Sequence, residues 1–294
     1  MVDTVVPFDK ILVPLDGSTL ADSTVLALRT SLRPMFKELV LVTALGEDPG
    51  EVAITDAQVY VGHAELVVAF EHRMKRVAAE LAAVGITGTT RVMTRTPFDA
   101  VSRSIADDPS IGAVALTTHG RWGFGQRRLG QVAERVLRGG STPLLFIPPG
   151  YQPPTGDDGE PRPVRRILVP IDSNKDAWGI NVHVHALAQL YQAHVDLVYV
   201  DRTIRATPMS DFERRVLLEA AGAEFGKTGL HVEALHRVGW NVESQVDSAV
   251  TERQSDLVVM ATHGRAALFR WLLGSHAESL LRRLRVPVLV VRIG

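Results

Sequence analysis

The sequence contains one long motif twice, and this duplication limits the possible folds more than any other feature. Residues 114–148 read VALTTHGRWGFGQRRLGQVAERVLRGGSTPLLFIP, and residues 257–292 read LVVMATHGRAALFRWLLGSHAESLLRRLRVPVLVVR. Each copy has Thr-His-Gly-Arg followed by nine residues between two motif glycines. A single spacing of 144 residues relates the matched positions, which are His119 with His263, Gly130 with Gly274, and Pro143 with Pro287.

The beginnings of the two copies match as well. KILVPLD at 10–16 corresponds to RILVPID at 166–172, so that Asp16 matches Asp172 with a spacing of 156 residues. The stretch PPGYQPPTGDDGEPRP between the copies is rich in proline, glycine and acidic residues, which is typical of a linker. A chain of 294 residues accommodates two domains of this size, each with its own core. The boundaries that we predict are 1–148 for the first domain, 149–163 for the linker and 164–294 for the second domain.

Buried apolar runs alternate with segments of helical periodicity in both halves. In the first half we expect strands at 10–16, 38–45 and 89–94, with helices up to about Arg33 and over 64–83 and 98–107. The second half repeats this order, with strands at 166–172 and 194–201 and helices at about 177–193 and 211–225. It is twelve residues shorter between its first strand and its repeated loop, since the spacing falls from 156 to 144, and we expect most of this difference opposite 46–62. Such alternation predicts an α/β fold of two tandem doubly wound domains, each a five-stranded parallel sheet with helices on both faces.

Composition removes several classes of function. The 32 Lys and Arg residues balance 33 Asp and Glu residues, which gives no electrostatic case for nucleic acid or for an anionic membrane as a partner. Cysteine is absent, which excludes disulfides and thiolate chemistry and fits a reducing compartment. No apolar run reaches the ~18 residues needed to cross a bilayer. We therefore expect a soluble, cytoplasmic protein.

The repeated loop has the order expected of a phosphate-binding site. A strand that leads through a glycine-containing loop into a helix presents free backbone N–H groups and the positive end of the helix dipole. Ser275 follows Gly274 at the start of the last helix, where its hydroxyl can cap the helix or bind a phosphate oxygen. Glycines that serve only as turn residues and aspartates that serve only as caps explain the same spacing equally well.

Other motifs do not favour a catalytic site. GAEFGKT at 222–228 is one residue short of a P-loop and lies between a helix and a strand, which is the reverse of the required order. His183 and His185 point to different faces of a helix, so we expect surface histidines, together with His194, rather than a metal site. His119 and His263 recur without a second catalytic group beside them, which favours a role in orienting the loop.

Taken together, these motifs resemble the universal stress protein family in its tandem form. The resemblance rests on a strand ending in Asp, the Thr-His-Gly loop, nine intervening residues, Gly-Ser and a final strand opened by Pro, and it covers nearly the whole chain. It implies an adenine-nucleotide α-hydrolase-like fold. In the second domain it implies that Asp172 and the backbone at Val200 hold adenosine. The loop and the phosphate contacts would come from Ala261, His263, Gly264, Gly274 and Ser275, with Ala261 standing where the family has its first glycine.

The first domain departs further from the family pattern. Its corresponding residues are Asp16, Ala44, Thr117, His119, Gly120, Gly130 and Gln131. Thr117 adds a branched side chain where the family has a glycine, and Gln131 replaces the Ser or Thr that follows the last glycine. We therefore expect the second domain to hold the better site.

The resemblance implies a stress-response regulator that binds ATP or a related adenine nucleotide, with Mg²⁺ left open, and hydrolyses it slowly or not at all. The last strands, at 142–148 and 286–292, would be sheet edges through which the two domains pair, and a homodimer of whole chains and an unidentified protein partner stay open. Two alternatives remain. One is a scaffold that binds no nucleotide, and the other is a phosphohydrolase. Its hydrolysis would be weak, because no general base, Walker lysine or metal-binding carboxylate pair is identified.

Overall fold

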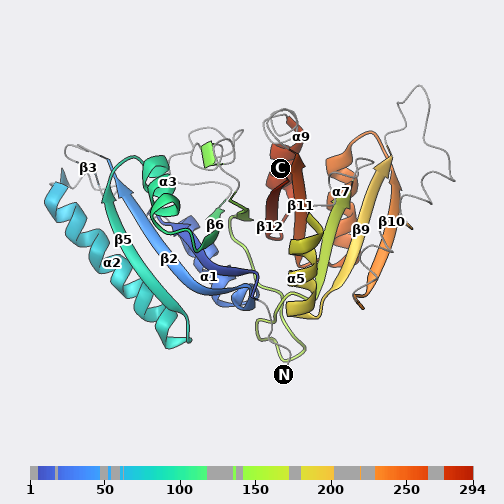
Figure 1. Ribbon diagram of the computed structural model, residues 1–294, viewed down its shortest axis with the longest axis horizontal. Coiled ribbons are helices and arrows are strands. Elements are labelled where there is room, and N and C mark those ends of the chain that lie inside the picture. The colour runs from blue at the N-terminus through green and yellow to red at the C-terminus, as the bar shows by residue number, and fades with distance from the viewer. Residues whose placement is uncertain are drawn as a thin grey trace.

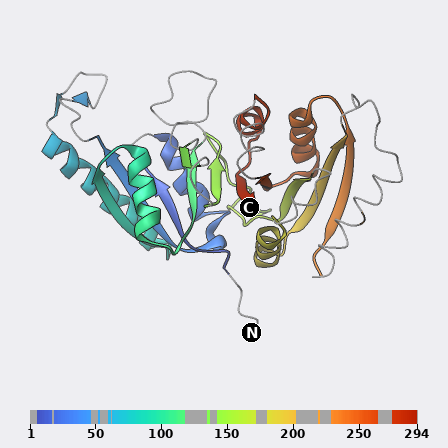
Figure 2. The same ribbon diagram turned by 45° about the horizontal axis from the view of Figure 1, so that its top comes forward.

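We describe the fold from a computed structural model of the chain. It describes residues 6–16, 19–46, 52–53, 60–61, 63–117, 135–136, 142–171, 180–201, 219, 229–263 and 275–293. Figure 1 shows two α/β halves side by side, with the first half in blue to green and the second in yellow to red. The turned view in Figure 2 shows helices on the two sides of each half's strands.

The first domain follows the predicted alternation of strands and helices. Its sheet strands are β1 (Phe8–Pro14), β2 (Phe36–Leu45), β5 (Thr87–Thr94), β6 (Ile111–Thr117) and β7 (Leu144–Ile147). Its helices are α1 (Thr19–Arg29), the 3-10 turn η1 (Arg33–Met35), α2 (His63–Ala83) and α3 (Pro97–Asp107). The Thr96 side chain caps α3 by accepting a hydrogen bond from the Asp99 N–H, as expected ahead of a proline at the first helical position.

The second domain repeats this set of elements. Its strands are β8 (Arg166–Ile171), β9 (His194–Asp201), β10 (Val232–Val238), β11 (Leu257–His263) and β12 (Val288–Ile293). Its described helices are α5 (Asn181–Tyr191), α7 (Val242–Arg253) and α9 (Ser275–Arg283). The helix predicted at 211–225 lies outside the described residues, apart from residue 219.

The two parallel sheets join into one sheet of ten strands, in the order β10-β9-β8-β11-β12-β7-β6-β1-β2-β5. Within each domain the third, second, first, fourth and fifth strands lie side by side, and all of their pairings are parallel. The predicted fold is therefore confirmed. The strand order reverses between β1 and β6 in the first domain and between β8 and β11 in the second, where a doubly wound sheet opens a crevice.

Apolar helix faces cover the sheet on both sides. One core cluster joins the sheet to α1, α2 and α5, and includes Leu28, Leu81 and Leu187. A second cluster joins the opposite face to α3, α7 and α9, and includes Val101 and Val246. Because strands buried on both faces must be apolar throughout, this layering explains the continuous apolar runs of the sequence.

The domains meet through their last strands. Strand β12 pairs with β7 in antiparallel register, with Leu289 opposite Leu145 and Val290 opposite Leu144. This is the pairing of the two domain edges that the family resemblance implied. It removes two apolar sheet edges from solvent, and so stabilises the arrangement of the two halves.

The segment between the domains packs against both of them. The hydroxyl of Tyr151, which is buried, lies 2.6 Å from the Ser31 Oγ of the first domain. The Arg162 guanidinium donates to both oxygens of Asp256 in the second domain, at 2.9 and 3.0 Å. A bridge between Thr155 and Pro161 closes the turn between these two anchors. The composition of this segment predicts a linker, but its contacts make it a strap held at both ends.

Two local expectations need correction. The first helix was expected to continue to about Arg33 and instead ends at Arg29, after which η1 carries Pro34 in its first turn. The predicted loop at 46–62 contains a short antiparallel pair, β3 (Val52–Ala53) with β4 (Tyr60–Val61). Two-residue strands are too short to produce the apolar alternation by which a strand is recognised.

Candidate functional site

The carboxyl edge of the first sheet brings three of the expected residues together. Asp16 follows β1, Ala44 lies near the end of β2, and Thr117 is the last residue of β6, on the other side of the strand-order reversal. All three are half-buried. Because carboxyl ends of parallel strands share one edge, these residues flank the crevice in which doubly wound folds bind ligands.

Buried hydrogen bonds fix the turn that carries Asp16. The Leu15 N–H donates to the Val42 carbonyl at 2.8 Å, which extends the β1–β2 ladder by one residue. The fully buried Thr43 hydroxyl donates to the Leu15 carbonyl at 2.9 Å, and it lies 3.3 Å from the Met74 sulfur on α2. The backbone beside the first crevice is therefore held from β2 and from α2.

The second sheet places Val200 and Ala261 at the matching positions. Val200 is opposite Arg237 on β10 and packs on the same face as Val242 of α7. Ala261 is opposite Val291 and packs against the core of the other face, so a small residue lines the crevice where the family pattern has glycine. Both side chains are half-buried, which leaves part of each accessible at the edge.

The phosphate side of the predicted site is described only in part. Ser275 begins α9, as predicted, whereas His263, which was predicted in the loop, is the last residue of β11. The side chains of both lie outside the described residues. The start of α9 at Ser275 places a helix N-terminus directly after Gly274 in the sequence, the location that suits an anion. The remaining expected residues lie outside the described residues: Asp172, Gly264, Gly274, His119, Gly120, Gly130 and Gln131.

The structure adds a polar cluster beside Val200 that our sequence analysis missed. The buried Asp201 carboxylate lies 4.0 Å from the His236 Nε2 on the neighbouring strand. The His236 ring stacks with the Tyr199 ring, with centroids 6.1 Å apart, and the Asp201 carbonyl accepts a hydrogen bond from the Gly239 N–H at 3.0 Å. The available signal was an acidic residue at the carboxyl end of a largely apolar strand, one position after Val200.

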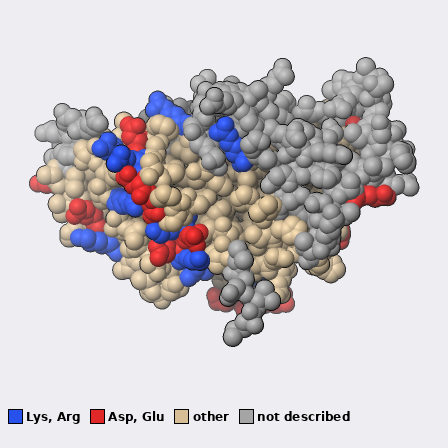
Figure 3. All heavy atoms as spheres, viewed as in Figure 1, with Lys and Arg blue, Asp and Glu red and all other residues tan. Residues whose placement is uncertain are grey.

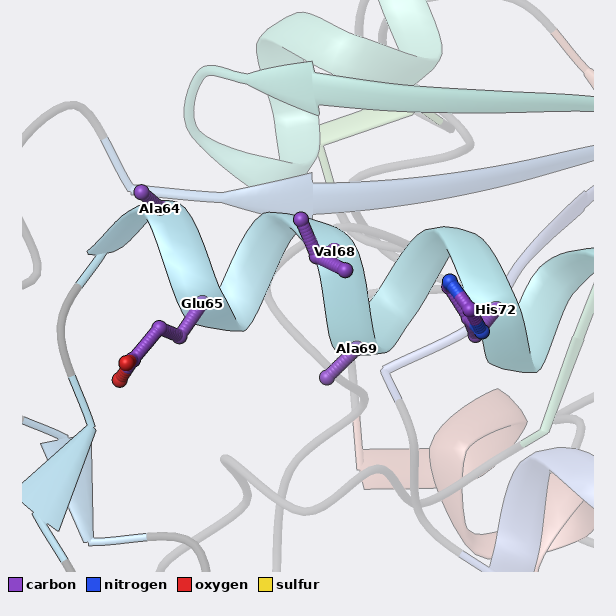
Figure 4. Close-up of a pocket in the computed structure, with 5 residues that line it drawn as sticks. All are labelled: Ala64, Glu65, Val68, Ala69 and His72. Atoms are coloured by element: carbon purple, nitrogen blue, oxygen red, sulfur yellow. The ribbon is translucent and has the colours of Figure 1, made fainter.

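A shallow hollow lies on the outer face of α2. Figure 4 shows its lining residues, which all come from this helix: Ala64, Glu65, Val68, Ala69 and His72. It lacks the convergence of several strand ends that makes a nucleotide crevice, and so it is a surface feature of one helix.

The charged side chains on the surface of the first domain show no large patch of one sign on the face seen in Figure 3. On the face seen in Figure 3, positive and negative side chains lie interspersed over the first domain. Within the part of the chain that the structure describes, no three His, Asp or Glu residues gather as a metal site. Among the described helices, none is both long and apolar enough to cross a membrane.

Comparison with known proteins defines the class. A sequence model of the universal stress protein family matches residues 7–148 and 163–292, which is most of the chain in two tandem segments. The chain therefore belongs to the universal stress protein family, and it carries two tandem domains of that family. This confirms the resemblance recognised from the Thr-His-Gly loops and the repeated strand openings.

Individual relatives agree with this assignment. A universal stress protein of Methanocaldococcus jannaschii is 27% identical over 145 residues, which is 44% of this chain and 82% of the relative. The structure of a universal stress protein from Archaeoglobus fulgidus is similar with a TM-score of 0.70 and 20% identity, and covers 97% of each chain. A structure from Pseudomonas aeruginosa UCBPP-PA14 gives a TM-score of 0.62 at 18% identity, over 97% of this chain and 93% of that chain. The two structural similarities concern the fold of the whole tandem chain.

Proposed function

We propose that this chain is a stress-response regulator that binds ATP or a related adenine nucleotide, with its best-formed site in the second domain. The observation that carries the proposal is the crevice between β8 and β11, where the strand order reverses and Val200 and Ala261 reach one edge of the sheet. Nucleotides bind doubly wound sheets at such a reversal. Membership of the family supports the same assignment.

In this proposal the residues divide into an adenosine side and a phosphate side. Asp172 would accept hydrogen bonds from the ribose hydroxyls, and the backbone at Val200 would contact the base. Ala261 and His263 at the end of β11 would lead through Gly264 into the loop, and Gly274 with Ser275 would bind the phosphates at the start of α9. Mg²⁺ would accompany a triphosphate through its phosphate oxygens and water, as this ion usually does.

The first domain would bind more weakly. Thr117 lies at the end of β6, where its branched side chain occupies the position at which the family has glycine. Asp16, Ala44, His119, Gly120, Gly130 and Gln131 complete the corresponding set. We propose one well-formed site per chain rather than two equal ones.

The proposal also covers the setting of the protein. We place the domains at 1–148 and 164–294, joined by 149–163, in a cytoplasmic protein whose nucleotide state alters its affinity for a protein partner or a second chain. Hydrolysis would be slow or absent, since no general base is assigned to the crevice. A scaffold of the same fold without a ligand is the alternative, and the departures at Thr117 and Gln131 favour it for the first domain.

The first experiment is to purify the chain without added nucleotide, denature it, and quantify released nucleotides by chromatography and mass spectrometry. We expect about one adenine nucleotide per chain. Two per chain would show that the first domain also binds. If none is released and calorimetry detects no ATP binding, the scaffold alternative replaces the proposal. Incubation with ATP and Mg²⁺ then distinguishes a binding protein from a phosphohydrolase by the presence of product.

A further inference from the structure

His183, for which the sequence predicted a surface position, is half-buried in the junction between the domains. Its Nδ1 atom is buried and has no hydrogen-bond partner among the residues that the structure describes. Its ring centroid is 6.3 Å from that of Phe8, which belongs to β1 of the other domain. The helical spacing correctly separated His183 from His185, but it could not reveal that the face carrying His183 packs against the first domain.

The surroundings of His183 are apolar. Phe8 is 3% exposed, and Val184 and Leu187 on the same helix are fully buried. Helix α5 packs against η1 of the first domain. At the matching position of the first domain, 156 residues earlier, the chain has Ala27, which is also fully buried. The second domain thus has an ionisable group where the first has a methyl group.

Charged groups on the adjoining elements are engaged elsewhere. Burial lowers the pKa of His183 below its usual value of 6.5. The neighbouring ionic contacts are Asp9 with Lys37 at 2.5 Å, Lys10 with Asp108 at 2.9 Å and the Arg33 guanidinium with the Gly85 carbonyl at 2.8 Å, while His185 on α5 has interactions of its own. Protonation of His183 would therefore put a charge among apolar side chains.

We propose that His183 makes the domain junction acid-sensitive, because its protonation weakens the packing of α5 against Phe8 and η1. A closed junction disfavours the proton, whereas an opened junction lets water hydrate the imidazolium. The contact is fully stable above the usual pKa of 6.5 and loses stability as the pH falls below it. The opening equilibrium changes by at most about tenfold between pH 7.5 and pH 5.5 for a single proton.

The test is amide hydrogen exchange of α5, β7 and β12 in the full chain at pH 7.5 and pH 5.5, corrected for the intrinsic pH dependence of exchange. In the wild type we expect a several-fold rise in junction opening at the lower pH. His183→Leu, which cannot be protonated, should remove that rise. His231→Gln is the matched control, because it removes an exposed histidine outside the junction and should retain the rise. An equal rise in His183→Leu would overturn the proposal.

A second measurement follows the wild-type protein itself, and a substitution serves only to assign the His183 signals. Titration of the wild-type imidazoles by NMR, with His183→Ala used for assignment, should place the pKa of His183 below its usual value of 6.5. Alanine is the residue that the first domain already tolerates at this position. A pKa of 6.5 or above for His183 would contradict the proposal, whatever the exchange data show.

Discussion

The second strands of the two domains have the same position in their sheets but carry different chemistry at their ends. In β2 the residues facing one side are Thr43 and Leu45, and in β9 the matching residues are Tyr199 and Asp201. Thr43 lies opposite Val92, whereas Tyr199 lies opposite His236. Duplication has thus preserved the strand pairing while the side chains beside the crevice have diverged.

This difference distinguishes the residues that determine strand pairing from the residues that determine the chemistry at the carboxyl edge of each sheet. Strand order and register depend on the pattern of apolar residues, which a duplicated gene keeps because the central strands are buried on both faces. The side chains at the carboxyl ends of β2 and β9 are buried as well, yet they differ between the two domains. The two crevices are therefore best compared by substitutions that exchange or remove their distinguishing residues.

The largest effect should come from placing the second-domain residue, Asp201, at the matching position of the first domain, Leu45. Leu45→Asp buries a carboxylate opposite Thr94 in a place without a matching histidine, and should lower the free energy of unfolding by about 4 kcal/mol. Asp201→Leu should cost about 1 kcal/mol or less, because an apolar side chain of similar volume replaces the buried carboxylate. Urea unfolding monitored by circular dichroism measures both. Equal losses would mean that the two strand ends have equivalent surroundings.

A smaller effect should appear when the nucleotide crevices are compared directly. Gly274→Val adds a branched side chain before α9, and should weaken ATP binding at least tenfold, or about 1.4 kcal/mol. Gly130→Val, the matched change in the first domain, should leave the affinity of the tight site unchanged. Isothermal calorimetry with ATP measures both variants. A loss in Gly130→Val alone would reverse our ranking of the domains.

The segment between the domains offers a change that should lower the free energy of unfolding by about 1 kcal/mol. Tyr151→Phe removes the 2.6 Å hydrogen bond to Ser31 and should lower stability by about that amount at pH 7. Burial raises the pKa of Tyr151 to about 12, so its contribution persists below pH 10 and is lost as the pH rises toward 12. The difference between wild type and Tyr151→Phe in urea unfolding should shrink over that range. Ser31→Ala is the control, because it removes the same hydrogen bond. The double variant of Ser31→Ala and Tyr151→Phe should therefore be little less stable than either single variant.

The smallest effect should come from Asp108, which precedes β6 at the amino edge of the first sheet. Hydrogen bonds from the Ser110 hydroxyl and from Lys10 lower the pKa of Asp108 to about 2. The contribution of this carboxylate is present above pH 3.8 and is lost as the pH falls to about 2. Asp108→Asn should therefore cost under about 1 kcal/mol at pH 7 and less at pH 2, where the carboxylate is partly protonated. Glu252→Gln, at the matching but exposed position, should produce no measurable change in the same unfolding series.

Most of the architecture could be predicted from the sequence because long apolar runs leave few choices. The predicted strand at 194–201 coincides with β9, and the helix predicted at 64–83 differs from α2 by one residue. The end of the first helix was less predictable. Nothing before Pro34 in the sequence marks the stop at Arg29, and the 3-10 turn that follows is set by its packing against α5.

The candidate site was predictable in its position but incomplete in its residues. Asp16, Ala44 and Thr117 reach one edge because strand order alone determines which carboxyl ends meet. The contact between Asp201 and His236 depends on the register of β9 with β10, which lie 35 residues apart at this pair, and no local pattern specifies it. For the same reason, the burial of His183 could not be deduced from its own helix.

The antiparallel contact between β7 and β12 has a consequence for how such a protein can evolve. In a dimer of identical chains, every substitution at the seam appears twice, once on each side of the twofold axis. Here both halves belong to one chain, so Phe8 can contact His183 while the positions related to them by the pseudo-twofold axis are Val164 and Ala27. Covalent fusion has released the seam from symmetry, and either half can acquire a new property without imposing it on the other.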